Sequence, residues 1–156
     1  MAPPSALLPA RPRPRSRSAR TLTAPASLEA LAALDDTTAM LSVVRGLPAR
    51  LLRQLAGRLD LSIEQLAGPL QLTPRTLLRR LQEGTLAQPE SERLLAITRL
   101  FFQTACVLDG ETKAAHWLQS PLPVLAGKTP LDCMTTWLGI QQVQATLWRI
   151  EDGVIA

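Results

Sequence analysis

Proline and glycine residues divide the stretch 111–153 into short segments, and this division restricts the fold more than any other feature of the sequence. The breaks fall at Pro121, Pro123, Gly127, Pro130, Gly139 and Gly153. Proline removes an amide donor from a helix interior, and glycine is the usual residue where a helix stops. We therefore expect a helix at about 111–119, a rigid turn, a short helix capped by Thr129, and a last helix that begins after Gly139.

The residues before this stretch carry apolar side chains at helical spacing, without the strict alternation of a strand. Only 3% of the residues are aromatic, so the core must consist mainly of leucine and alanine, which favour helix. We expect helices at 27–45, 48–60, 62–70, 73–83 and 89–109. The third of these begins with the capping-box pair Ser62 and Gln65 and ends near Pro69. The predicted fold class is all-α.

Positive charge is concentrated toward the N-terminus, although the net charge is only +4. Residues 1–20 contain five Arg and no acidic residue, and residues 46–100 contain eight Arg and five acidic residues. Residues 101–156 contain three basic and five acidic residues. This distribution indicates a DNA-facing N-terminal part and a C-terminal part with a different partner. We expect residues 1–26, rich in Pro, Arg and Ser, to form a disordered arm, either a solvated tail or a segment that follows DNA phosphates.

A helix-turn-helix motif is predicted at 62–83, with its second helix in the major groove of DNA. The inner face of that helix should consist of Leu77, Leu78 and Leu81, and the outer face of Thr76, Arg79 and Glu83. Arginine can pair with guanine edges or phosphates, and helix starts can bind phosphates. The candidate DNA-binding residues are Ser62, Thr73, Arg75, Thr76, Arg79 and Arg80. Gln71 stands where the turn of such a motif usually has glycine.

The C-terminal landmarks occur in a specific order. They are Ala115, Trp117, Leu118, Pro121, Leu125, Gly127, Pro130, Leu131, Asp132, Thr136, Gly139, Val143, Leu147, Arg149, Ile150 and Gly153. This order resembles the ParS-like toxin-binding domain of Xre-type antitoxins, in which a helix-turn-helix also lies upstream. The resemblance covers about residues 46–153. The family does not explain the arm at 1–26. After the arm we expect a helix-turn-helix DNA-binding region at 27–86, a connecting and dimerisation helix at 87–110, and a small helical toxin-binding domain at 111–156.

The resemblance implies a toxin partner, most commonly a RES-domain toxin that resembles ADP-ribosyltransferases and uses NAD. It also implies dimerisation, toxin–antitoxin hetero-oligomers and repression of the chain's own operon at operator DNA. Physical reasoning favours the end of the last helix for toxin binding, because apolar and charged side chains meet there. The candidate toxin-binding residues are Trp148, Arg149, Glu151, Asp152, Val154 and Ile155. Trp137 is a second candidate for an exposed anchor, whereas Trp117 and Leu147 are expected in the core.

The helix at 89–109 has a continuous apolar face that includes Leu94, Ile97 and Phe101. Part of this face is expected to be buried against a second copy, because two-fold symmetric proteins suit palindromic operators.

Two other functions are alternatives to an antitoxin. One is a stand-alone helix-turn-helix regulator without a toxin partner. The other is a small enzyme based on His116 with Cys106, Cys133 or Asp132, but a single histidine supports no metal cluster or catalytic set. We therefore expect no enzymatic activity, no cofactor and no metal. The two cysteines are expected to be reduced core residues, and a cytoplasmic protein without a membrane partner is expected.

Overall fold

The computed structural model describes residues 22–153, and this part of the chain is built from helices. They are α1 (Leu28–Ala32), α2 (Asp36–Arg45), α3 (Arg50–Leu59), α4 (Pro74–Glu83), α5 (Gln88–Leu108), α6 (Glu111–Leu118), the 3-10 helix η1 (Pro123–Leu125), α7 (Pro130–Cys133) and α8 (Trp137–Glu151). Within residues 22–153 there is no β-strand, only an isolated bridge between Pro48 and Thr85. The same range holds no helix with the length and apolar character needed to cross a membrane. The predicted all-α fold class is confirmed.

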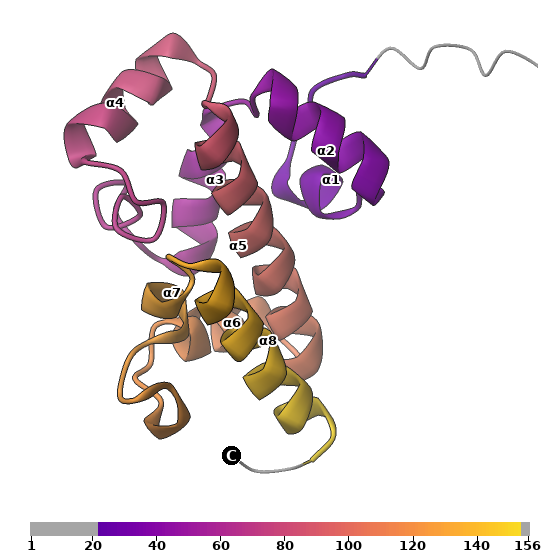
Figure 1. The fold of residues 1–156 in the computed structure, drawn as a ribbon, viewed down its shortest axis with the longest axis vertical. Helices are drawn as coiled ribbons and strands as arrows, with labels where there is room; N and C mark the ends of the chain where they lie inside the picture. Colours follow the sequence, from indigo (N-terminus) through magenta and orange to yellow (C-terminus); the bar gives the residue numbers. More distant parts are fainter. Residues whose placement is uncertain (1–21, 154–156) are drawn as a thin grey trace, which may run out of the picture.

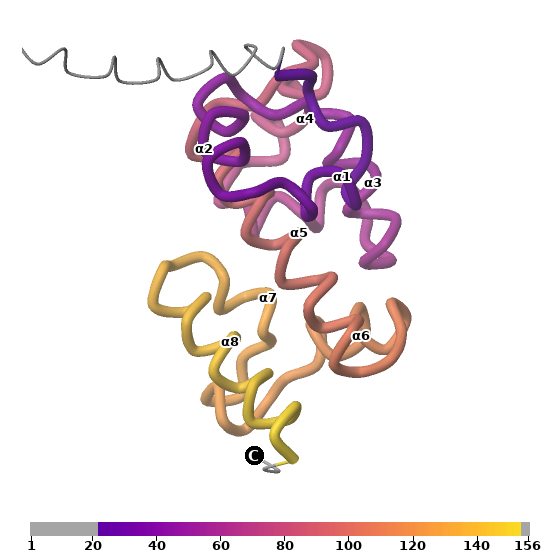
Figure 2. Tube along the Cα trace, turned by 90° about the vertical axis from the view of Figure 1, so that its right-hand side faces the viewer, coloured from indigo at the N-terminus to yellow at the C-terminus, as the bar shows by residue number. Residues whose placement is uncertain are grey.

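Helix α5 is the longest element, and the other helices are arranged along it (Figure 1). Helices α1 and α2 lie on one side of its N-terminal half, and α4 lies on the other side. Helices α6 and α8 flank its C-terminal half from opposite sides (Figure 2). Because α5 is continuous over 21 residues, it joins the two halves of the molecule as a rod about 30 Å long.

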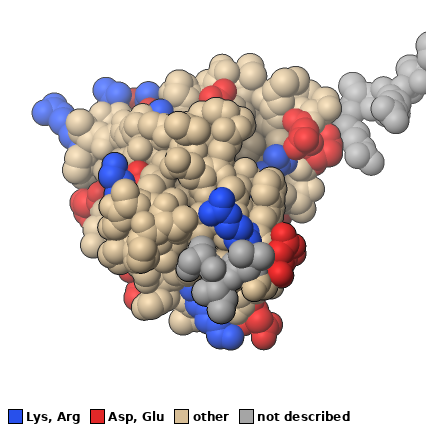
Figure 3. All heavy atoms as spheres, turned by 60° about the horizontal axis from the view of Figure 1, so that its bottom comes forward, with Lys and Arg blue, Asp and Glu red and all other residues tan. Residues whose placement is uncertain are grey.

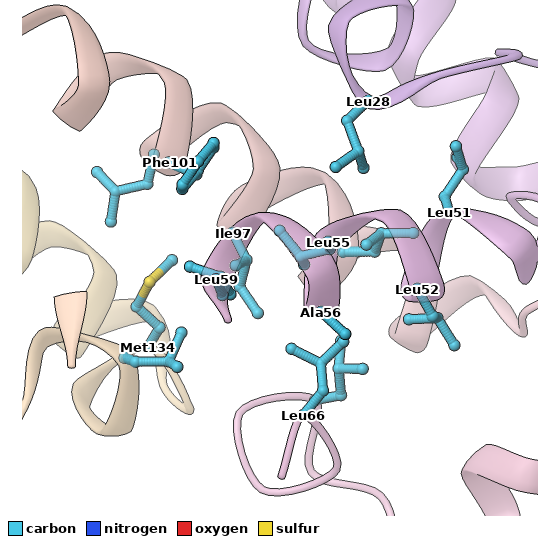
Figure 4. Close-up of a cluster of buried hydrophobic side chains, with 14 of the residues drawn as sticks. Leu28, Leu51, Leu52, Leu55, Ala56, Leu59, Leu66, Ile97, Phe101 and Met134 are labelled. Carbon is cyan, nitrogen blue, oxygen red and sulfur yellow. The ribbon is translucent and has the colours of Figure 1, made fainter. Parts of the chain in front are cut away.

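One hydrophobic core runs through both halves of the molecule. Leu55 of α3 lies among side chains from α1 and α5, including Leu28 and Ile97 (Figure 4). Met134, which follows α7, belongs to the same cluster near Phe101. Full burial of such a side chain stabilises the fold by about 1.5–3 kcal/mol. The two halves therefore share their main source of stability.

This core also covers the apolar face of α5. Leu94, Ile97 and Phe101 are buried against helices of their own chain. Phe102 is half-buried, with its ring edge-on to that of Phe101, and Cys106 is exposed. Helices of the same chain therefore bury most of this face, and burial of its remaining part against a second copy stays a prediction. The expectation that Cys106 lies in the core is wrong.

The segment 27–45 forms two helices, where the sequence pattern predicts one. Ser27 caps α1 as expected, accepting a hydrogen bond from the amide of Ala30 at 3.2 Å. Asp35 then caps α2, accepting a bond from the amide of Thr38 at 3.0 Å. An aspartate that satisfies an orphan amide favours a new helix start over continuation of the first helix.

Residues 62–70 form a series of turns instead of the predicted helix. The capping box itself is present: the amide of Gln65 donates to Ser62 Oγ at 3.2 Å, and the amide of Ser62 donates to Gln65 Oε1 at 2.8 Å. Leu66 and Leu70 are fully buried. Gly68 and Pro69 lie between these two leucines, and both residue types weaken a helix. The segment therefore lacks regular helical hydrogen bonds, and burial of its leucines holds it in place.

Gly139 lies inside α8 and does not separate two helices, contrary to expectation. Helix α8 begins two residues earlier, and Thr136 caps it by accepting a bond from the amide of Gly139 at 3.0 Å. A β-carbon on Gly139 would lie 1.7 Å from the carbonyl oxygen of Cys133. This glycine is therefore explained by close packing of α8 against the end of α7.

Residues 1–21 lie outside the described residues, so the disordered arm stays a prediction there. Residues 22–26, the end of the predicted arm, lie against α2 and α3. Arg45 donates to the carbonyl of Leu22 at 3.4 Å, and Arg50 donates to the carbonyl of Pro25 at 3.2 Å. The predicted arm is therefore too long by these residues.

Candidate functional surfaces

Helix α4 presents one face to solvent and one to the core. Thr73 caps it, accepting a bond from the amide of Thr76 at 3.2 Å, and Pro74 occupies its first turn. Leu77 is fully buried and Leu81 half-buried, as predicted. Leu78 is exposed, and the prediction that it faces inward is wrong. The buried face is centred on Leu77, and Leu78 lies about 100° away from it around the helix, which places it at the solvent edge.

The exposed face of α4 carries a shallow hollow of about 690 Å³. Its lining consists of Arg75, Thr76, Leu78, Arg79 and Gln82. Arg75 and Arg79 are one helical turn apart and both are exposed. Leu78 and Gln82 are missing from our sequence-based candidates; centring the helical wheel on Leu77 alone would have included them. The face combines two cations, an amide and an apolar side chain, which suits contact with base edges and phosphates.

Arg80 is occupied by carboxylates of its own chain. Its Nε donates to both carboxylate oxygens of Glu90, at 3.0 and 2.9 Å, and its Nη1 lies 2.9 Å from Glu83. Glu83 and then Glu90 raise the pKa of the Arg80 guanidinium. Glu90 is buried and also accepts a bond from the amide of Ala87, so Arg80 joins α4 to the start of α5.

The remaining DNA-binding candidates lie at segment starts. Ser62 and Thr73 are exposed, and their hydroxyl oxygens each accept a backbone amide. Glu83, predicted to face outward, does so, and its carboxylate lies 3.7 Å from Arg79 as well as close to Arg80. The two arginines offset its charge, which reduces the repulsion that an isolated glutamate would have for a phosphate.

The end of α8 carries the other predicted site. Trp148 is 53% exposed, and Arg149, Glu151 and Asp152 are all exposed. Within residues 22–153, none of the three charged side chains takes part in an ion pair. The structure therefore brings these four residues together at one end of the molecule. Val154 and Ile155, the other two candidates, lie outside the described residues.

The other tryptophans behave largely as predicted. Trp137 is 73% exposed, Trp117 is half-buried against the core, and Leu147 is fully buried.

Residues 22–153 contain no cluster of His, Cys, Asp and Glu that could hold a metal ion. His116 is exposed and Cys133 is half-buried, and burial raises the pKa of the Cys133 thiol. A raised thiol pKa disfavours the thiolate that a nucleophile requires.

Two family models match the two halves of the chain. Residues 39–99 match the antitoxin Xre-like helix-turn-helix domain. Residues 104–153 match the antitoxin Xre/MbcA/ParS C-terminal toxin-binding domain. The boundary between the two matches falls within α5, the helix that both halves share. The fold and these matches define a helical antitoxin with one DNA-binding and one toxin-binding domain.

Two curated proteins are similar over part or most of the chain. Antitoxin Xre of Pseudomonas putida is 33% identical over 85 residues, which cover 53% of this chain and 54% of that protein. The chain thus spans about half the length of this relative. The Prs ADP-ribosylating antitoxin of a Sphingobium species is 27% identical over 124 residues, covering 73% of this chain and 78% of that protein. The chain belongs to the Xre/MbcA/ParS antitoxin family.

Proposed function

We propose that this chain is the antitoxin of a type II toxin–antitoxin pair that neutralises a RES-type, NAD-consuming toxin and represses its own operon. The observation that carries the proposal is the presence of two separate exposed surfaces at the two ends of α5. One is the outer face of α4 with Arg75 and Arg79, and the other is the end of α8 with Trp148. Neither DNA binding nor toxin binding requires a catalytic cleft. We therefore propose a binding protein without enzymatic activity or cofactor.

The toxin class is inferred from the name of one relative and from the family resemblance. The Sphingobium relative carries a name that refers to ADP-ribosylation. ADP-ribosyl transfer takes its group from NAD, and this agrees with the NAD-using RES toxins that the family resemblance implies. We propose that the α8 end, with Arg149, Glu151 and Asp152 beside Trp148, enters or covers the nucleotide cleft of such a toxin. Val154 and Ile155 are proposed to extend this contact.

The DNA surface is proposed to consist of Arg75, Thr76 and Arg79, with Ser62 and Thr73 contacting phosphates. Arg80 is not among the groups that we propose to reach DNA, because Glu83 and Glu90 already bind its guanidinium.

A homodimer remains part of the proposal, because one recognition helix reads only half of a palindromic operator. We also propose that the protein acts in the cytoplasm, where its operator lies.

The test is co-expression with the product of the neighbouring toxin-like gene. The proposed function predicts that the two proteins co-purify, that the complex lacks the toxin's NAD-consuming activity, and that the antitoxin shifts its own promoter fragment. A chain that shifts the promoter but neither binds nor inhibits the toxin would instead be a stand-alone regulator, the alternative function.

A further inference from the structure

The exposed face of α8 is not limited to the C-terminal end of the helix, because it also includes residues near the start. Trp137 and Trp148 are eleven positions apart, which places them about 20° apart around the helix and about 16 Å apart along it. They are 73% and 53% exposed, and Gln141 and Gln144 occupy the same stripe between them. Exposed tryptophans are unusual because each one leaves a large apolar surface in water.

A groove of about 330 Å³ lies beside Trp137 at the start of α8. Apolar side chains line it, including Ala96 of α5, Met134 and Ile140. Arg93 and Glu92 of α5 also contribute to the lining. The groove therefore lies between the helix-turn-helix match and the toxin-binding match, and it has room for an apolar side chain of a partner.

The stripe carries no charge. Residues 137–148 contain no Asp, Glu, Lys, Arg or His. Figure 3, in which the bottom of Figure 1 comes forward, shows large uncharged areas and several separate groups of basic and acidic side chains. DNA binding requires cations to meet phosphates, and a charged peptide requires opposite charges, so neither partner suits this stripe. An apolar protein surface does suit it.

We propose that the toxin docks along three turns of α8, with Trp137 and Trp148 as its two anchors and an apolar toxin side chain in the groove beside Trp137. This inference rests on the proposed function. The toxin is the chosen occupant because the whole of α8 lies in the match to the toxin-binding domain, and because the stripe is continuous with the proposed contact at the α8 end. The two indoles expose on the order of 300 Å² of aromatic surface, a substantial part of the roughly 800 Å² that each partner buries in a stable interface.

The first experiment compares toxin affinities of full-length variants by titration calorimetry with the purified co-expressed toxin. Trp137→Ala should weaken binding about 30-fold, as expected for an aromatic anchor. Leu138→Ala is the matched control, because Leu138 is the next residue, is 64% exposed and lies off the stripe. A loss of about tenfold or more for Trp137→Ala, with less than about threefold for Leu138→Ala, supports the proposal; any other pair of values overturns it.

The second experiment observes the anchors directly. The chain is labelled with 5-fluorotryptophan, its three fluorine signals are assigned with single Trp→Phe variants, and unlabelled toxin is added. The Trp137 and Trp148 signals should both shift, and that of Trp117 should shift least. A shift confined to Trp148 would restrict the contact to the α8 end and overturn the proposal. If wild-type chain binds no toxin at all, the proposed function fails as well, so the two failures are distinguishable. If Trp137→Ala alters the sedimentation of the chain without toxin but leaves the toxin affinity unchanged, the stripe is a self-association surface and the proposal is wrong.

Discussion

The side chain of Gln71 connects the two halves of the molecule, because its Nε2 donates a hydrogen bond to the carbonyl oxygen of Thr135 at 2.9 Å. Gln71 lies in the turn before α4, and Thr135 lies just before α8. The φ angle of Gln71 is 54°, in the left-handed region where glycine is the usual residue. A glycine would adopt this conformation more easily, but it would lack the amide that reaches Thr135.

Substitutions at Gln71 separate these two effects. Gln71→Ala keeps a β-carbon at positive φ and removes the hydrogen bond, so the free energy of unfolding should fall by about 1 kcal/mol. Gln71→Gly also removes the bond but relieves the backbone, and it should be about 1 kcal/mol more stable than the alanine variant. Urea denaturation measures both differences. An alanine variant as stable as the wild type would show that the bond to Thr135 contributes no net stability.

The exposed arginines of α4 should determine operator affinity. Replacing Arg75 and Arg79 with Ala is expected to weaken specific DNA binding by about 1–3 kcal/mol for each arginine that pairs with a base. Arg53→Ala controls for the loss of one positive charge, since Arg53 is exposed on α3 and does not line the hollow on α4. Fluorescence anisotropy with the promoter fragment at fixed salt measures the affinities, and toxin binding should not change. Equal effects of the control and the double variant would indicate only nonspecific charge attraction.

Arg80 should affect stability more than DNA binding. Arg80→Ala leaves the buried carboxylate of Glu90 without its guanidinium partner, and we expect the free energy of unfolding to fall by about 2 kcal/mol. The neighbouring Arg79→Ala variant removes a more exposed guanidinium and should change stability by less than about 0.5 kcal/mol. Thermal and urea unfolding of the two variants provide the comparison. Similar values for both would contradict a structural role specific to Arg80.

Two glycines inside helices should respond oppositely to alanine. Gly139→Ala places a β-carbon against the carbonyl oxygen of Cys133, and it should destabilise the protein by about 2 kcal/mol or more. Gly57 lies within α3, and a β-carbon added there would meet no atom within 4 Å, so Gly57→Ala should stabilise by about 0.5–1 kcal/mol. Chemical denaturation tests the pair. A stable Gly139→Ala variant would mean that α7 and α8 can separate at little cost.

Removal of residues 151–156 should reduce toxin neutralisation while leaving the fold intact. The deletion begins at the last residue of α8 and spares the buried Leu147. Circular dichroism should show unchanged helix content, whereas growth rescue from the toxin should decline if the α8 end enters the nucleotide cleft. Full rescue by this folded variant would mean that neutralisation depends on another surface of the domain.

Local sequence patterns predicted most helix starts correctly. Ser27, Thr73 and Thr129 act as N-caps, because a hydroxyl that accepts an amide three residues later is a local interaction. The same reasoning failed at Asp35, a helix cap inside a segment that we expected to continue as one helix. At 62–70 the predicted cap is present, but the backbone around Gly68 and Pro69 forms turns. Burial of Leu66 and Leu70, which depends on distant segments, determines its conformation.

The sequence by itself determined the all-α class, because the class follows from helical periodicity. It also determined the order of the DNA-binding and toxin-binding parts, because the order of its landmark residues resembles that of a known family. Only the tertiary structure decided which of those side chains remain well exposed to a partner. Arg79 and Arg80 are neighbours of the same type, yet the buried Glu90, ten positions later, occupies Arg80. Likewise, periodicity gives α5 a continuous apolar face, but only the tertiary structure shows that other helices of the same chain bury Leu94, Ile97 and Phe101 on it. Contacts between distant segments decide such questions, because burial and charge pairing depend on proximity in space, which local spacing does not specify.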